Sequence, residues 1–136
     1  MTDALKMTQD LYAAFERGDL PALLDAMHPD IEWSSNSDAE TFPWGGTRNG
    51  KEGAASFFKA LSDNMTFTTF APRMFFPGND FCAVLGFSAA TFKTNGMPAQ
   101  SEWMHLFTYS GDKLTMFREY YDTKAVAHAF ALAAVK

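Results

Sequence analysis

Hydrophobic and polar positions alternate with a period of two on both sides of a short polar stretch, residues 110–113 (SGDK), near the carboxyl end of the chain. Such alternation is typical of β-strands with one buried face, and the polar stretch is typical of a hairpin turn. A loop of three residues, 111–113, predicts these opposite pairs: Ser110 and Leu114, Phe107 and Phe117, His105 and Glu119, Trp103 and Tyr121. The face shared by the last three pairs is aromatic except for one imidazole and one carboxylate.

The first half of the chain follows a helical period instead. Apolar residues at spacings of three and four predict an amphipathic helix over residues 3–17. A second, short helix is expected after Asp19, with Pro21 in its first turn, where a missing N–H costs nothing. A third helix is expected over residues 51–62.

Strands dominate the rest of the pattern. A first strand begins at residue 30, and a polar loop, residues 35–50, follows it. That loop contains Phe42 and Trp44, which indicates that it folds back over the interior. Further strands are expected over residues 65–76, 81–93, 100–110 and 114–121, and a last helix over residues 124–135.

This order of elements predicts one α+β domain over residues 1–136. Helices grouped around one strand come first, and a four-stranded antiparallel meander follows. A strongly curved antiparallel or mixed sheet, closed by the N-terminal helices, would form a cone. The aromatic face of the last hairpin would then line a pocket inside that cone.

The composition supports a thick apolar interior, because 47 % of the residues are hydrophobic and 15 % are aromatic. A net charge of −5 argues against a nucleic-acid or anionic-membrane partner, since no basic face is available. The start of the chain has no signal-peptide run and no stretch is long enough to span a membrane, so a cytoplasmic setting is expected. Cys82, the single cysteine, lies in an apolar run, where a buried, inert thiol is the usual outcome. Three scattered histidines and one cysteine give no metal-ligand spacing, so neither a metal nor a cofactor is expected.

Four stretches, covering nearly the whole chain in order, resemble the nuclear transport factor 2-like superfamily, and within it the SnoaL-like and ketosteroid-isomerase-like branch. They are residues 15–19 (FERGD), 27–33 (MHPDIEW), 46–53 (GTRNGKEG) with the phenylalanines at 57 and 58, and 107–114 (FTYSGDKL) continuing to 118–122 (REYYD). The resemblance implies a conical α+β barrel with a deep pocket at its wide end. It also implies a homodimer packed through the outer face of the sheet.

His105 and Glu119 are the central candidate pair. SnoaL-like polyketide cyclases have an acid–base His on the strand before this turn and an acid on the strand after it, so the resemblance implies these roles here, with Glu in place of the more usual Asp. Burial raises a carboxylate pKa and lowers an imidazole pKa, while their mutual attraction does the reverse. Either outcome brings the pKa of one of the two groups closer to 7, where acid–base catalysis at neutral pH is efficient. The alternative is a buried pair that only joins two strands.

Two other polar residues each have two interpretations. Tyr12 lies on the buried stripe of the first helix, and its phenol either donates a hydrogen bond into the pocket, as the resemblance to ketosteroid isomerases implies, or packs in the core. Asp122 either caps the last helix or is an acid at the pocket rim. Arg118 is expected to point to the other face of the sheet.

Five aromatic residues are candidate walls of the pocket, although for each one taken alone the core is the more usual place: Trp33, Trp44, Trp103, Phe117 and Tyr121. Together they favour a small apolar or aromatic molecule, including a polycyclic one, as the ligand.

These observations lead to the hypothesis of a cofactor-independent lyase or isomerase, similar to polyketide cyclases, that acts on an apolar carbonyl compound. His105 would be the base, Glu119 would orient it, and Tyr12 would hold the oxyanion. The alternative is a non-catalytic ligand-binding or dimeric assembly module of the same fold. A transport adaptor like the namesake of the superfamily is a third, weaker possibility.

Two related activities are disfavoured by residues that are absent. Limonene-epoxide-hydrolase-like relatives need an Arg-x-Asp on the long neighbouring strand, where residues 85–90 read LGFSAA. Ketosteroid isomerases carry their base Asp just after the first strand's apolar residue, where this chain has Ser34 and Ser35 after Trp33.

Overall fold

The computed structural model describes residues 3–94 and 96–135. Its helices and strands follow one another in the order of an α+β domain, as the sequence predicts. The elements are α1 (Ala4–Glu16), α2 (Leu20–Asp25), β1 (Met27–Ser35), β2 (Thr47–Asn49), α3 (Gly50–Asn64), β3 (Met65–Pro77), β4 (Phe81–Phe92), β5 (Pro98–Ser110), β6 (Lys113–Tyr121) and α4 (Thr123–Val135). The short strand β2 lies inside the stretch that was predicted to be a loop.

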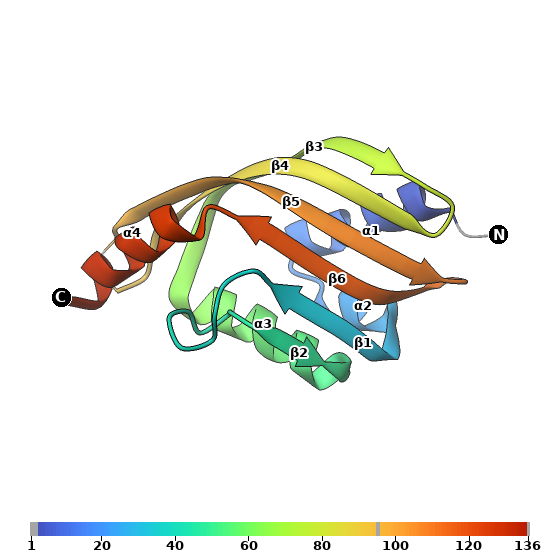
Figure 1. Cartoon of the computed structure of the whole chain (residues 1–136), viewed down its shortest axis with the longest axis horizontal. Helices are drawn as coiled ribbons and strands as arrows, with labels where there is room; N and C mark the ends of the chain where they lie inside the picture. Colours follow the sequence, from blue (N-terminus) through green and yellow to red (C-terminus); the bar gives the residue numbers. More distant parts are fainter. Residues whose placement is uncertain (1–2, 95, 136) are drawn as a thin grey trace.

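Six strands form one sheet in the order β2-β1-β6-β5-β4-β3. Strands β3 to β6 make the predicted antiparallel meander. Strand β1 runs parallel to β6 and antiparallel to β2, so the sheet is mixed. The sheet is strongly curved and stays open, with α1, α2 and α3 on its concave side and α4 beyond the end of β6 (Figure 1). This is the expected cone.

Helix α1 shows how local sequence sets these elements. Asp3 caps its first turn by accepting a hydrogen bond from the backbone N–H of Lys6. Thr8 and Leu11 are buried because their spacing places them on the side that faces the sheet. The side-chain oxygen of Thr8 approaches the Tyr109 hydroxyl at 2.6 Å, which joins the helix to β5.

The hairpin of β5 and β6 differs from the prediction at its turn. Ser110 pairs with Lys113 and not with Leu114, so the loop holds only two residues. The first of these, Gly111, has a φ of +60°, as a two-residue hairpin turn of this kind requires. A bulge at Thr115 then shifts the register back by one residue. Beyond the bulge the three predicted pairs are confirmed: Phe107 with Phe117, His105 with Glu119, and Trp103 with Tyr121.

Candidate functional site

A cavity of about 120 Å³ lies between the concave face of the sheet and the helices. Its wall is mainly aromatic, with a few polar side chains, as is usual for small-molecule sites. The free volume is somewhat smaller than the roughly 150 Å³ that holds benzene in an engineered cavity, so a larger ligand requires side chains to move. Eight of the predicted site residues line this cavity: Tyr12, Trp33, Trp44, Trp103, His105, Phe117, Glu119 and Tyr121.

Glu119 lies at the centre of the inward face of three adjacent strands. Ser35 on β1 and His105 on β5 are its direct neighbours across the sheet. Phe117 and Tyr121 are the next inward residues of β6, one on each side of it. The carboxyl group therefore has one imidazole, one hydroxyl and a ring of aromatic side chains around it.

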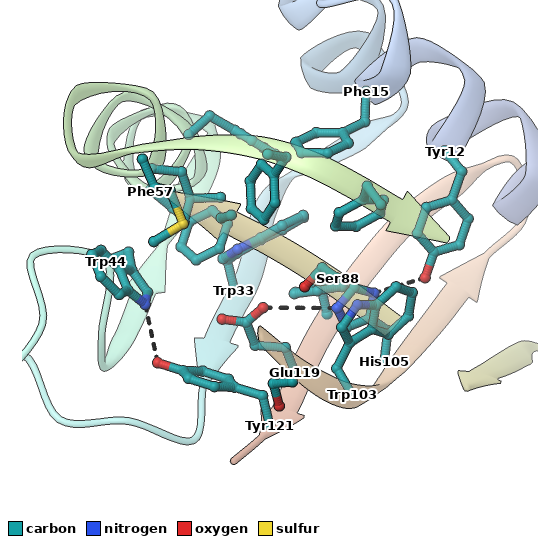
Figure 2. A pocket seen from close by; sticks show the side chains of 18 of the residues that line it. Tyr12, Phe15, Trp33, Trp44, Phe57, Ser88, Trp103, His105, Glu119 and Tyr121 are labelled. Carbon is teal, nitrogen blue, oxygen red and sulfur yellow. Dashed lines mark hydrogen bonds and ion pairs between the residues drawn. The ribbon is translucent and has the colours of Figure 1, made fainter. Parts of the chain in front are cut away.

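Tyr12, His105 and Glu119 form a line of polar groups across the cavity (Figure 2). The Tyr12 hydroxyl is 2.7 Å from His105 Nδ1, and His105 Nε2 is 3.7 Å from Glu119 Oε2, which is too long for a direct hydrogen bond. The imidazole stacks on the Trp103 ring with centroids 3.8 Å apart, which fixes its plane. A neutral His105 with its proton on Nε2 would accept a hydrogen bond from Tyr12 and point its own donor toward Glu119.

Burial moves the pKa values of these groups in opposite directions. Burial lowers the pKa of His105 to about 3, so its imidazole is neutral near pH 7. Burial raises the pKa of Glu119 to about 7, although a hydrogen bond from Ser35 acts the other way. Burial also raises the pKa of Tyr12, whose phenol stays protonated. Glu119 is therefore the member of the line that exchanges a proton near neutral pH.

A second set of hydrogen bonds fixes the loop of residues 36–46 over the cavity. The Trp44 indole N–H donates to the Tyr121 hydroxyl at 3.0 Å, and the hydroxyls of Ser35 and Ser37 lie 2.9 Å apart. Phe42 and Trp44 are each only 2 % exposed, which confirms that this loop folds back over the interior.

Two contributors to the site were missed by the sequence prediction. Gly86 lies opposite Trp103 on β4, and a side chain there would collide with the indole, so only glycine leaves room for it. A glycine inside a strand pattern is a signal of such close approach. Ser35 was overlooked although it follows Trp33 by two residues and so shares its face.

The other candidate residues lie outside the cavity. Asp122 is exposed, and its carboxylate accepts a hydrogen bond from Ala125 N at 3.0 Å as the cap of α4. Arg118 points outward, 3.9 Å from the Glu32 carboxylate. Cys82 is fully buried, and burial raises the pKa of its thiol.

Two kinds of feature are absent from residues 3–94 and 96–135. No three or more His, Cys, Asp and Glu side chains gather there as a metal site would require. No helix in these ranges has the length and apolar character needed to cross a membrane.

Several solved structures are similar to this chain over most of its length. An NTF2-like protein from Burkholderia xenovorans LB400 is 28 % identical with a TM-score of 0.83, over 93 % of this chain and 94 % of that one. TerC, co-crystallised with polyporic acid, is 26 % identical with a TM-score of 0.81, over 93 % and 97 % of the two chains. A Mesorhizobium loti protein provisionally named a SnoaL-like polyketide cyclase has the same fold, with 19 % identity and a TM-score of 0.72, over 89 % and 100 %. No curated protein matches the sequence.

The model of the SnoaL-like domain matches residues 8–117, most of the chain. This match confirms the resemblance that the sequence motifs indicated. The chain belongs to the SnoaL-like domain family, within the NTF2-like superfamily.

Proposed function

We propose that this protein binds a small, apolar carbonyl compound in its cavity and moves a proton on it, as a cofactor-independent isomerase or lyase. One observation carries the proposal: among the described residues that line the cavity Glu119 is the only one with a carboxyl group, and burial raises the pKa of that group to about 7. A base with that pKa combines a useful ionised fraction at neutral pH with enough basicity to take a proton.

In the proposed reaction the Glu119 carboxylate takes a proton from a carbon next to the carbonyl group. The electron pair of the broken C–H bond moves into the carbonyl and forms an enolate. Glu119 then returns the proton to a different carbon, which completes an isomerisation, or the enolate expels a leaving group, which completes a lyase reaction. His105, held neutral by burial, directs its Nε2–H toward this end of the cavity and stabilises negative charge there.

These roles differ from the hypothesis drawn from the sequence, in which His105 was the base. An imidazole with a pKa of about 3 is too weak a base at neutral pH, whereas Glu119 is suited to the task. Tyr12 then acts mainly through His105, because its hydroxyl contacts Nδ1 and so favours the tautomer with the proton on Nε2.

The comparisons support a ligand-binding role. TerC, which is similar over 93 % of this chain, was co-crystallised with polyporic acid. Other proteins of this fold carry provisional names as isomerases or polyketide cyclases.

Hydrogen–deuterium exchange at carbon tests the proposal. With 2-indanone in D2O, the wild type is expected to accelerate exchange of the protons next to the carbonyl, and Glu119→Gln to lose at least 100-fold of that acceleration. The rate should rise with pH through about 7, because only the ionised carboxylate takes a proton. Glu52→Gln, which removes an exposed carboxyl group from α3, is the matched control.

A non-catalytic binding module is the second candidate, because the mainly aromatic wall of the cavity is by itself enough to bind a small apolar molecule. It predicts that the wild type and Glu119→Gln bind the ketone equally and that neither accelerates exchange. That result, repeated over a panel of aromatic and alicyclic ketones, would refute the catalytic proposal.

A further inference from the structure

Two of the three tryptophans have an indole N–H with no hydrogen-bond partner. Trp33 and Trp103 are 5 % and 6 % exposed, and neither Nε1 atom is hydrogen-bonded to any described residue. The third, Trp44, donates to Tyr121. Buried N–H groups almost always have a partner, because an unpaired donor loses its interaction with water and gains nothing in return. Both unpaired indoles belong to side chains that line the cavity. Their Nε1 atoms themselves have almost no accessible surface, so a ligand reaches them only when neighbouring side chains of the cavity wall move.

The two indoles flank Glu119 on opposite sides. Trp33 on β1 is level with Phe117, two residues before Glu119, and Trp103 on β5 is level with Tyr121, two residues after it. All of these side chains face inward, so a ligand lying over Glu119 has one indole at each end. Figure 2 shows Trp33 and Trp103 on either side of the Glu119 side chain.

Ring stacking fixes both donors before any ligand binds. Trp33 stacks on Phe117 with centroids 4.0 Å apart and an angle of 20° between the planes. Trp103 stacks on His105 at 3.8 Å and 12°, over the space that Gly86 leaves free. Donors that are already fixed lose little conformational entropy when a ligand binds.

We infer that the indole N–H groups of Trp33 and Trp103 bind oxygen atoms of the ligand, and that the ligand is an uncharged, planar aromatic ketone. An indole N–H only donates, so its partner must be an acceptor such as a carbonyl oxygen. The aromatic walls select a planar apolar skeleton. No Lys or Arg is among the described residues that line the cavity, so nothing there balances a charged carboxylate or phosphate on the ligand. This inference rests on the proposed function for the position of the ligand over Glu119.

Indole NMR signals give the first test. The chain has three tryptophans, so a ¹⁵N–¹H spectrum contains three indole signals, which Trp33→Phe, Trp44→Phe and Trp103→Phe assign by the loss of one each. Two probes of nearly equal shape are added, acetophenone and α-methylstyrene, in which a CH2 group replaces the carbonyl oxygen. Acetophenone should move the Trp33 or Trp103 signal downfield and leave Trp44 in place, and α-methylstyrene should produce no downfield shift. Absence of a downfield shift at both Trp33 and Trp103 would overturn the inference.

The affinity ratio of the same probes gives the second test. The wild type should bind acetophenone about tenfold more tightly than α-methylstyrene, the factor that one net hydrogen bond contributes. Trp33→Phe or Trp103→Phe should reduce the ratio toward one, and Trp44→Phe, which removes a donor already paired within the protein, should keep it. The ratio cancels changes in cavity size, because such changes affect both probes. An unchanged ratio in both variants would contradict the inference.

These tests separate the inference from the proposed function. If acetophenone moves the indole signals but ketones undergo no exchange, the catalytic proposal fails and the inference stands. If exchange depends on Glu119 while both indole signals stay in place, the inference fails and the catalytic proposal stands. In the NMR measurement the three Trp→Phe variants serve only to assign the signals, so they must fold but need not keep the full stability of the wild type.

Discussion

At the scale of single residues, His105 and Glu119 make the free energy of unfolding depend on pH in opposite directions. The pKa of Glu119 rises from 4.5 to about 7 on folding, so its contribution to stability is complete below pH 4.5 and is lost as the pH rises toward 7. The pKa of His105 falls from 6.5 to about 3, so its contribution is complete above pH 6.5 and is lost as the pH falls toward 3. Between pH 4.5 and 6.5 the two trends oppose each other.

Substitution of one of these two residues should reveal the pH dependence that the other gives to the free energy of unfolding. In Glu119→Gln the free energy of unfolding should decrease from pH 6.5 to 4.5 by up to about 1.4 kcal/mol per pH unit relative to the wild type, because only His105 remains. In His105→Gln it should decrease in the opposite direction, from pH 4.5 to 6.5. Urea denaturation followed by tryptophan fluorescence measures both. A Glu119→Gln profile parallel to that of Glu52→Gln, the exposed control, would show that Glu119 is not buried as described.

The sequence could identify the His105–Glu119 pair but not the state of its members. Alternation of side chains was enough to place both residues on one face and opposite each other. Their pKa values depend on whether desolvation or mutual attraction dominates. That balance depends on a separation of 3.7 Å and on burial by other elements that leaves the two side chains 7 % and 15 % exposed. Neither quantity can be obtained from the spacing of residues along one hairpin.

At the scale of elements, three hydrogen bonds join the loop of residues 36–46 to β6, and the Trp44 indole makes the one that lies over the cavity. Tyr121→Phe would leave the Trp44 N–H buried without its partner, which is expected to reduce the free energy of unfolding by about 1–3 kcal/mol. Hydrogen exchange of the backbone amides in residues 36–46 should also become faster. The control is Tyr120→Phe, which removes a phenol hydroxyl from the preceding residue. Tyr120 is 40 % exposed on the other face of β6. Equal stability of the two variants would mean that this hydrogen bond does not stabilise the loop, and that its apolar contacts and its bonds through Asn36 are enough to hold it.

Prediction at this scale succeeded where a pattern extends over many residues and failed where a neighbour decides the structure. The long strands of the meander follow their alternation, although β3 has a bulge at Arg73, next to Pro72. Strand β2 has only three residues and no buried position, so it exists because it pairs with β1. The two-residue turn was missed because the bulge at Thr115 compensates for it farther along the hairpin.

At the scale of the whole molecule, the outer face of the sheet carries a continuous apolar row. The strand registers place Met74, Leu85, Met104 and Tyr120 side by side across β3, β4, β5 and β6. Each of these side chains is between 39 % and 54 % exposed, and the row lies on the side opposite helices α1, α2 and α3 (Figure 1). Exposed apolar surface of this continuity is typical of an interface between proteins. We propose that two copies of the chain pair through this row, as the family resemblance implied.

Leu85→Glu tests this pairing, because Leu85 lies in the middle of the row and a carboxylate from each copy would be buried at the interface. The wild type is expected to have the mass of a dimer in size-exclusion chromatography with light scattering, and Leu85→Glu the mass of a monomer, 15.1 kDa. Ser62→Glu adds the same charge to the exposed side of α3 and should remain dimeric. Because the cavity lies between the concave face of the sheet and the helices, away from this row, the monomeric variant should still bind the ketone 2-indanone. A monomeric wild type, or a Leu85→Glu variant that stays dimeric, would rule out this face as the interface.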